Sequence, residues 1–309
     1  MQFFDSSKSS INQSLDLIDG HSIIIKREDL LHPVISGNKF RKLKYVFQDV
    51  IEKKIPLVIT FGGAFSNHLA ATASAGKALG VATIGIVRGA EWENQISNST
   101  TLSYCMQQGM QLYCISRVAY TQKENAGEVQ KILSKYQQFK LIPEGGTEPL
   151  AIKGCTEILN EKDNDFDTIC TSVGTGGTLA GLIQAAGSNQ KVIGFNALKN
   201  PEVEKVIRSH TKSDNWEINN QYTFGGYAKI NLELIHFMNA FYKQYQIPLD
   251  PIYTGKMLFA IFDLVKAQQW KWGKRILIIH TGGLQGIAGM NLQLQKKKLP
   301  LLSYTKDLY

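Results

Sequence analysis

Short apolar segments alternate along the chain with longer segments of helical length. The short segments are rich in Val and Ile and are bounded by glycine, proline or charged residues, which is typical of buried strands. They lie at 22–26, 56–61, 81–87, 111–115, 168–172, 191–195 and 275–280. The longer segments predict helices at 38–53, 66–79, 96–108, 122–137, 149–160, 178–187, 231–244 and 256–271. This alternation predicts an α/β architecture with parallel sheets.

One polar segment, 211–226, interrupts the alternation and is predicted to be a long loop. The chain has 309 residues, of which 43% are hydrophobic, and this is enough for two ordinary globular domains. A second sheet or an inserted domain is therefore expected.

Composition indicates a cytoplasmic protein. No apolar run approaches the roughly 18 residues of a membrane span, and the N-terminus lacks the apolar core of a signal peptide. The four cysteines form no C-x-x-C pair and have no histidine at zinc-ligand spacing, so reduced thiols and no metal site are expected.

The net charge of +8 leaves a non-enzymatic, nucleic-acid-binding protein as an alternative. Such a protein would carry a basic stripe with interleaved aromatic residues. The lysines and arginines are instead scattered along the chain, so nucleic acid is not expected as a partner.

Glycine pairs follow three of the predicted strands, at 62–63, 176–177 and 282–283. In open α/β sheets, ligands bind outside the carboxyl ends of the strands, and glycine lets backbone N–H groups approach a ligand closely. A tight turn explains one such pair, whereas three of them predict a ligand crevice.

The glycine-rich segment SVGTGGTLAG, residues 172–181, follows a strand and opens a helix. Its N–H groups and hydroxyls would converge on a phosphate at the helix N-terminus. The residues concerned are Gly174, Thr175, Gly176, Gly177 and Thr178. A dinucleotide site is disfavoured because Leu179 replaces the third glycine and the next strand ends in Asn196 and Ala197, without an acid. A single terminal phosphate fits better, and pyridoxal phosphate is one such ligand.

Pyridoxal phosphate also requires a lysine for its aldehyde. Lys39 follows the turn and cap signal Ser36-Gly37-Asn38 and is predicted to start a helix. Nearby Arg41 and Lys42 would lower the pKa of Lys39 by disfavouring its charged form. Taken alone, a lysine at a helix start is usually a surface residue.

Seven motifs that follow one another along the chain favour a functional role for Lys39 instead. They are KRED at 26–29, GNKFRKL at 37–43, GGAFSNH at 62–68, IPEGGT at 142–147, SVGTGGTLAG at 172–181, DPIYTGK at 250–256 and HTGG at 280–283. Together they closely resemble the fold-type II pyridoxal-phosphate enzymes. In particular, they are similar to the 1-aminocyclopropane-1-carboxylate deaminase / D-cysteine desulfhydrase family.

The resemblance implies roles for individual residues. Lys39 would carry pyridoxal 5'-phosphate, and Asn67 would bond the ring hydroxyl of the cofactor. Ser66, Asn67 and His68 would hold the substrate carboxylate, with Ser66 also handling protons. Tyr253 and, on a more variable loop, Tyr227 would stand near the cofactor ring.

Two departures from the deaminase pattern indicate the branch of the family. Where ring-opening deaminases have a glutamate at the pyridine nitrogen, this chain has Thr254, and Thr281 stands where they tend to have leucine. A hydroxyl stabilises a protonated ring less well than a carboxylate does, and expelling a thiol should need a weaker electron sink than opening a cyclopropane ring. The predicted activity is therefore that of a D-cysteine desulfhydrase. The alternatives are 1-aminocyclopropane-1-carboxylate deaminase and an enzyme for another small amino acid.

The resemblance also implies the architecture. Two three-layer α/β/α domains would enclose the cofactor in the cleft between them. The small domain would be an insertion at 48–149, and the large domain would combine 1–47 with 150–309. Family members are usually homodimers, so a homodimer is expected here.

Overall fold

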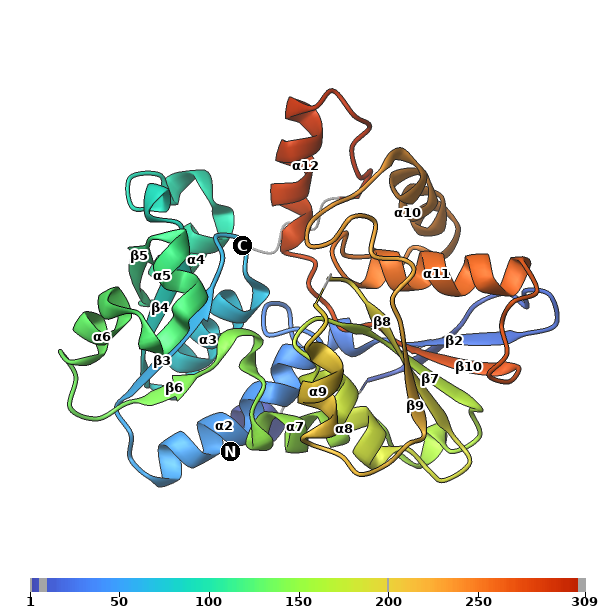
Figure 1. Ribbon diagram of the computed structural model, residues 1–309, viewed down its shortest axis with the longest axis horizontal. Helices are drawn as coiled ribbons and strands as arrows, with labels where there is room; N and C mark the ends of the chain where they lie inside the picture. Colours follow the sequence, from blue (N-terminus) through green and yellow to red (C-terminus); the bar gives the residue numbers. More distant parts are fainter. Residues whose placement is uncertain (1, 6–9, 199, 305–309) are drawn as a thin grey trace.

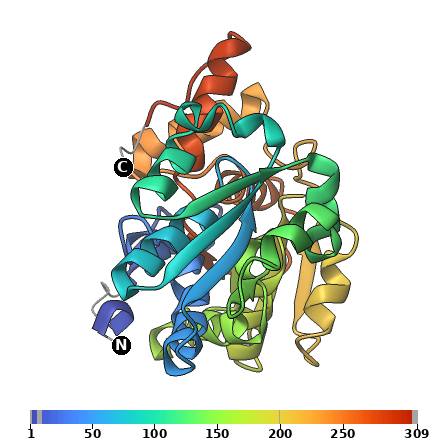
Figure 2. The same ribbon diagram turned by 90° about the vertical axis from the view of Figure 1, so that its left-hand side faces the viewer.

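The chain folds around two β-sheets, each covered by helices (Figure 1). The computed structural model describes residues 2–5, 10–198 and 200–304. In Figure 2 the part of the molecule that carries the smaller sheet faces the viewer.

The larger sheet has six strands in the order β1-β2-β10-β7-β8-β9. Its strands are β1 (Asn12–Ser14), β2 (Ser22–Lys26), β7 (Thr168–Val173), β8 (Lys191–Asn196), β9 (Trp216–Asn219) and β10 (Arg275–Ile279). Only the β1–β2 pair is antiparallel among these, and the register places Ile276 beside Ile23 and Thr168. The sheet therefore pairs a strand from the N-terminal part of the chain, β2, with a strand from its C-terminal part, β10.

The smaller sheet is parallel and has the order β5-β4-β3-β6. Its strands are β3 (Leu57–Gly62), β4 (Ala82–Arg88), β5 (Gln111–Ile115) and β6 (Lys140–Ile142). The strands of the two sheets fall on either side of the predicted domain division at 48–149, which itself stays a prediction.

Helices of ordinary length connect the strands. They are α1 (Gln2–Asp5), α2 (Asn38–Glu52), α3 (Asn67–Leu79), α4 (Thr100–Gln107), α5 (Arg117–Gln122), α6 (Gly127–Leu133), α7 (Pro149–Thr156), α8 (Gly177–Ala185), α9 (Val203–Arg208), α10 (Leu232–Tyr245), α11 (Thr254–Lys266) and α12 (Gly286–Lys296). None of these helices combines the length and apolar character that crossing a bilayer requires.

The alternation of side chains along β10 shows how the large sheet is covered on both faces. Ile276 and Ile278 pack with α10 and α11, whereas Leu277 and Ile279 pack with α8 and α9. The result is a three-layer α/β/α arrangement, which confirms the predicted fold class. In the smaller sheet, Ile59 likewise faces α6.

Two predictions about elements were wrong. The segment 211–226 is not a continuous loop, because Trp216–Asn219 forms β9 and pairs with β8. An edge strand with one partner keeps polar side chains, which hides it in the sequence pattern. The helix predicted at 122–137 is shorter, because only α6 over Gly127–Leu133 is α-helical within it. The preceding α5 ends at Gln122, and a short 3-10 turn follows at Lys123–Asn125, where Lys123 has φ +53°. The short strands β1 and β6 were not predicted.

The contact between α2 and α7 depends on Gly154. A methyl group at this position would lie 1.9 Å from the carbonyl oxygen of Arg41. We expect Gly154→Ala to lower the free energy of unfolding by about 1–3 kcal/mol, because backbone cannot move aside as a flexible side chain can. Thermal denaturation measures this, and Gly127→Ala is the control because nothing lies within 4 Å of its added methyl. Equal melting temperatures for the two variants would contradict this view of the helix contact.

Candidate active site

A cavity of about 630 Å³ lies at the carboxyl ends of the strands of both sheets. Residues from all three predicted glycine pairs line it, namely Gly63 after β3, Gly176 and Gly177 after β7, and Gly282 and Gly283 after β10. The predicted crevice and this cavity thus coincide.

Lys39 is the second residue of α2 and lines the cavity, with only 8% of its surface exposed. Its Nζ donates a hydrogen bond to Asn38 Oδ1 at 3.1 Å. Burial, and after it the charge of Lys42, lowers the pKa of Lys39 to about 7. The neutral, nucleophilic form of this amine is therefore accessible near neutral pH.

The expected effect of Arg41 on Lys39 was wrong. The Arg41 guanidinium donates to both carboxylate oxygens of buried Glu28, at 2.8 and 2.9 Å. Its charge is thus balanced by an acid, and desolvation is the main cause of the low pKa of Lys39.

The start of α2 is held against the loop after β10. Gly37 has φ +59°, and a methyl group there would lie 2.0 Å from the carbonyl oxygen of Thr281. The Asn38 N–H donates to that same oxygen at 3.3 Å. Only glycine fits this approach, so the turn that presents Lys39 is fixed by a segment more than 240 residues away in sequence.

The cradle predicted for a phosphate forms the N-terminus of α8. Thr178 Oγ1 accepts a hydrogen bond from Asn38 Nδ2 at 2.8 Å, and the hydroxyls of Thr175 and Thr147 lie 2.6 Å apart. No side chain covers the N–H groups of this turn, because Gly176 and Gly177 are its first residues. An anion is favoured here by the helix dipole.

Lys42 adds a cation to this cradle, which the sequence interpretation had missed. Its Nζ donates to Gly145 O at 2.7 Å. A methyl group added at Gly177 would lie 3.2 Å from this Nζ, so the ammonium is next to the turn. Lys42 is 2% exposed, and burial lowers its pKa. Its position three residues after Lys39, on the same face of a helix, was the signal that could have revealed it.

Ser66, Asn67 and His68 lie at the start of α3, on the other side of Lys39. Ser66 caps the helix by accepting the Leu69 N–H at 3.3 Å. The N–H groups of Asn67 and His68 have no acceptor within the helix, so they can bind an anionic group.

The protonation of His68 follows from its contacts. Thr60 Oγ1 donates to Ile142 O at 2.9 Å, so it must accept from His68 Nε2, also at 2.9 Å. Burial lowers the pKa of His68 well below its usual value, so the ring is neutral and its other nitrogen, Nδ1, is a bare acceptor, which has no hydrogen-bond partner in the described chain. This side chain cannot itself donate to a carboxylate, so any direct contact with one uses the main-chain N–H of His68.

Two tyrosines predicted near the cofactor ring line the cavity from different segments. Tyr253 precedes α11, and a methyl group at Gly174 would lie 3.1 Å from its ring. Tyr227 is 44% exposed, and the guanidinium carbon of Arg88 lies 5.8 Å from its ring centre. Arg88 ends β4 and also lines the cavity, and only its place at a strand end could have pointed to it.

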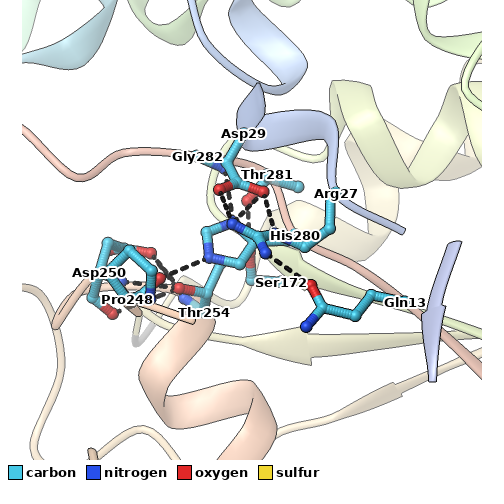
Figure 3. Close-up of polar contacts among 10 residues, drawn as sticks. All are labelled: Gln13, Arg27, Asp29, Ser172, Pro248, Asp250, Thr254, His280, Thr281 and Gly282. Carbon is cyan, nitrogen blue, oxygen red and sulfur yellow. Dashed lines mark hydrogen bonds and ion pairs between the residues drawn. The ribbon is translucent and has the colours of Figure 1, made fainter. Parts of the chain in front are cut away.

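His280 fixes the loop after β10 (Figure 3). Its Nε2 donates to Pro248 O at 2.8 Å, and its Nδ1 accepts the Gly282 N–H at 3.2 Å. Behind it, Arg27 binds both oxygens of Asp29 at 2.8 and 2.7 Å. The His280 N–H donates to Lys26 O at 3.0 Å, and His280 Nδ1 lies 3.6 Å from Asp29 Oδ1, so the KRED and HTGG motifs are neighbours in space.

Thr281 and Thr254 have different positions relative to the cavity. Thr281 lines it, and its hydroxyl lies 3.3 Å from that of Ser172. Thr254 does not line the cavity, and its hydroxyl donates to Asp250 Oδ2 at 2.8 Å. The Asp250 carboxylate, which does line the cavity, also accepts three backbone N–H groups of the turn before α11. The cofactor contact expected of Thr254 stays a prediction, and in this structure Asp250 lies between the Thr254 hydroxyl and the cavity.

The site thus combines a buried amine of low pKa with an anion cradle and a free helix N-terminus, and this set fits a phosphorylated aldehyde and an amino acid. Within residues 2–5, 10–198 and 200–304, no cluster of His, Cys, Asp or Glu is arranged to bind a metal ion. The arrangement is typical of an enzyme that depends on an organic phosphate cofactor.

Comparison with known proteins identifies the family. The chain belongs to the pyridoxal-phosphate dependent enzyme family, whose sequence model matches residues 13–282. A Pyrococcus furiosus protein named "Putative 1-aminocyclopropane-1-carboxylate deaminase" is 32% identical over 86% of each chain. An Arabidopsis thaliana protein named "Bifunctional D-cysteine desulfhydrase/1-aminocyclopropane-1-carboxylate deaminase, mitochondrial" is 28% identical over 88% of this chain and 74% of its own. A crystal structure of an "ACC deaminase homologue" aligns over 94% of both chains with a TM-score of 0.80 and 27% identity.

Proposed function

We propose that this protein is a lyase for a small amino acid and that its main reaction is that of a D-cysteine desulfhydrase. D-cysteine and water would give pyruvate, hydrogen sulfide and ammonia. The names of the relatives support both this activity and ring opening of 1-aminocyclopropane-1-carboxylate. The observation that favours the desulfhydrase is the hydroxyl of Thr281 in the cavity wall, where the ring-opening enzymes tend to have leucine.

Lys39 would hold the cofactor and then move the proton at the substrate Cα. When bound, pyridoxal phosphate supplies the electron sink for the negative charge left at that carbon. A pKa of about 7 suits Lys39 for both tasks, because the amine can attack an aldehyde and can also return a proton near neutral pH. Residues Gly174–Thr178, with Lys42, would bind the phosphate.

The start of α3 would orient the substrate. The N–H groups of Asn67 and His68, together with the Ser66 hydroxyl, would bind the α-carboxylate, and the Asn67 amide would bond the cofactor's ring hydroxyl. Tyr253 and Tyr227 would flank the reacting atoms from the opposite side. Their hydroxyls would lie beside the departing sulfur and could donate a hydrogen bond to it.

The assay that tests this proposal compares purified holoenzyme on D-cysteine, L-cysteine and 1-aminocyclopropane-1-carboxylate. We expect pyruvate and sulfide from D-cysteine at a higher kcat/KM than 2-oxobutanoate from the cyclopropane. Thr281→Val, which removes the hydroxyl and keeps the shape, should lower the rate on D-cysteine, whereas Thr281→Ser should preserve it. Faster ring opening by the wild-type enzyme would overturn the proposed branch and favour the deaminase.

A homodimer, which the resemblance implies, and a cytoplasmic location, which the composition indicates, complete the proposal. Light scattering on the purified holoenzyme would test the oligomeric state, because a mass near 69 kDa, twice the 34.5 kDa of one chain, is expected for a dimer.

A further inference from the structure

Lys256 is a buried cation that the proposed reaction does not use. It lies in the first turn of α11 with 2% of its surface exposed. Its Nζ donates to three main-chain carbonyl oxygens, of Ala197 at 3.2 Å, Thr223 at 2.9 Å and Gly226 at 2.7 Å. These acceptors match the three hydrogens of an ammonium group, and in the described chain Lys256 forms no ion pair.

Two of the three carbonyls belong to the loop 223–227, whose backbone is unusual. Phe224 has φ +51° and Ala228 has φ +54°, and Gly225 and Gly226 between them also have positive φ values. Positive φ values place these residues in the left-handed region of backbone conformation. Residues other than glycine keep such a conformation only where the surrounding structure stabilises it. Within the loop, Gly226 N–H donates to Thr223 O at 2.9 Å.

Helix α11 provides the side-chain contacts that stabilise this loop. Besides the ammonium of Lys256, the ring of Phe259 packs edge-on against the ring of Phe224 with centres 5.1 Å apart. Both contacts come from α11, and they hold residues 223–226, which lead directly to Tyr227.

Tyr227 has few contacts of its own. Its hydroxyl forms no hydrogen bond in the described part of the chain, and its ring faces Arg88 across the cavity. Apart from this ring contact with Arg88, the place of Tyr227 at the cavity depends on the backbone that carries it, and therefore on what holds residues 223–226.

We infer that Lys256 is a positioning residue, which holds the loop 223–227 through its carbonyl groups so that Tyr227 stands at the cavity. This inference rests on the role proposed above for Tyr227. Burial of a cation among neutral carbonyls is costly, and it lowers the pKa of Lys256 to about 8. An apolar side chain would fill the same space without this cost, but it would remove the link between α11 and all three carbonyls. The carbonyls of Thr223 and Gly226 would keep only the N–H donors within the loop and just after it, so the loop would lose its anchor to the helix.

The test is a double-mutant cycle of Lys256→Met and Tyr227→Phe in the holoenzyme, assayed on D-cysteine. We expect Lys256→Met alone to lower kcat about 10- to 100-fold, the usual effect of displacing a reacting group by about 1 Å. In the Tyr227→Phe background the same substitution should cost less than about 3-fold, because the hydroxyl that it positions is already absent. The control is Lys266→Met, in the exposed last turn of the same helix, which should leave kcat unchanged.

Hydrogen–deuterium exchange gives a readout that does not depend on turnover. Amides of residues 221–230 should exchange faster in Lys256→Met than in the wild-type holoenzyme, while those of α2 and α8 stay protected. If the Met variant loses its cofactor, Lys256→Gln, which keeps two N–H donors, takes its place in both measurements.

The outcomes are distinguishable. Equal losses of kcat in the wild-type and Tyr227→Phe backgrounds, or unchanged exchange at 221–230, would overturn the role of Lys256. If the wild-type enzyme leaves D-cysteine intact, the proposed function fails instead, and the exchange measurement still decides whether Lys256 holds the loop.

Discussion

Replacing Lys39 with methionine is expected to lower the rate on D-cysteine by about 10³-fold or more, because one amine is assigned both the cofactor attachment and the proton transfer. Borohydride reduction of the wild-type holoenzyme should fix one cofactor to the chain, with a corresponding increase in intact mass. The Lys39→Met protein should show no such increase. Its fold should survive, since the side chain lies at a cavity and makes a single hydrogen bond.

The matched control is Lys53→Met, at the exposed C-terminal end of the same helix. This variant should keep both the activity and the mass increase. Peptide mapping that finds the reduced cofactor on another lysine would contradict the assignment of Lys39.

Replacing Lys42 with methionine should weaken the binding of pyridoxal phosphate by roughly 10- to 150-fold, corresponding to the ~1.5–3 kcal/mol of a hydrogen bond to a charged group. The Lys42 ammonium lies beside the Gly177 turn that is proposed to bind the phosphate, and the other cationic side chains among the described residues that line the cavity are Lys39 and Arg88. A bound phosphate would also restore the charged form that burial disfavours. Equilibrium dialysis of the apoprotein measures this affinity.

Pyridoxal without the phosphate separates the roles of the two lysines. Lys42→Met should leave the affinity for pyridoxal nearly unchanged, whereas Lys39→Met should weaken both ligands. If Lys42→Met weakens pyridoxal and its phosphate equally, Lys42 acts on Lys39 or on the cavity shape rather than on the phosphate.

The sequence predicted most of the long strands and helices because their signals are local. The strands β3, β7 and β10 are buried on both faces and therefore read as continuous apolar runs. The strands that escaped prediction, β1, β6 and β9, have three or four residues each. Such short segments carry too few residues for a periodic pattern to stand out.

The surroundings of Thr254 show what motif spacing leaves open. Its place in the DPIYTGK motif is plain in the sequence, but the direction of its side chain depends on the turn before α11. There the carboxylate of Asp250 accepts the N–H groups of Ile252, Tyr253 and Thr254 and takes the Thr254 hydroxyl as well. A carboxylate that caps a helix competes for nearby hydroxyls, and motif spacing does not show the result.

By itself, the sequence determined the α/β class, the glycine turns after three strands and the lysine at the start of a helix, since each depends on neighbours within a few positions. Only the tertiary structure decided which charges meet. Lys42 reaches Gly145, about a hundred residues away, and Lys256 reaches Thr223 and Gly226, while Arg41 is drawn to Glu28 and away from Lys39. The reason is physical: once a cation is buried it must find acceptors, and which acceptors lie within reach is set by how the sheets pack.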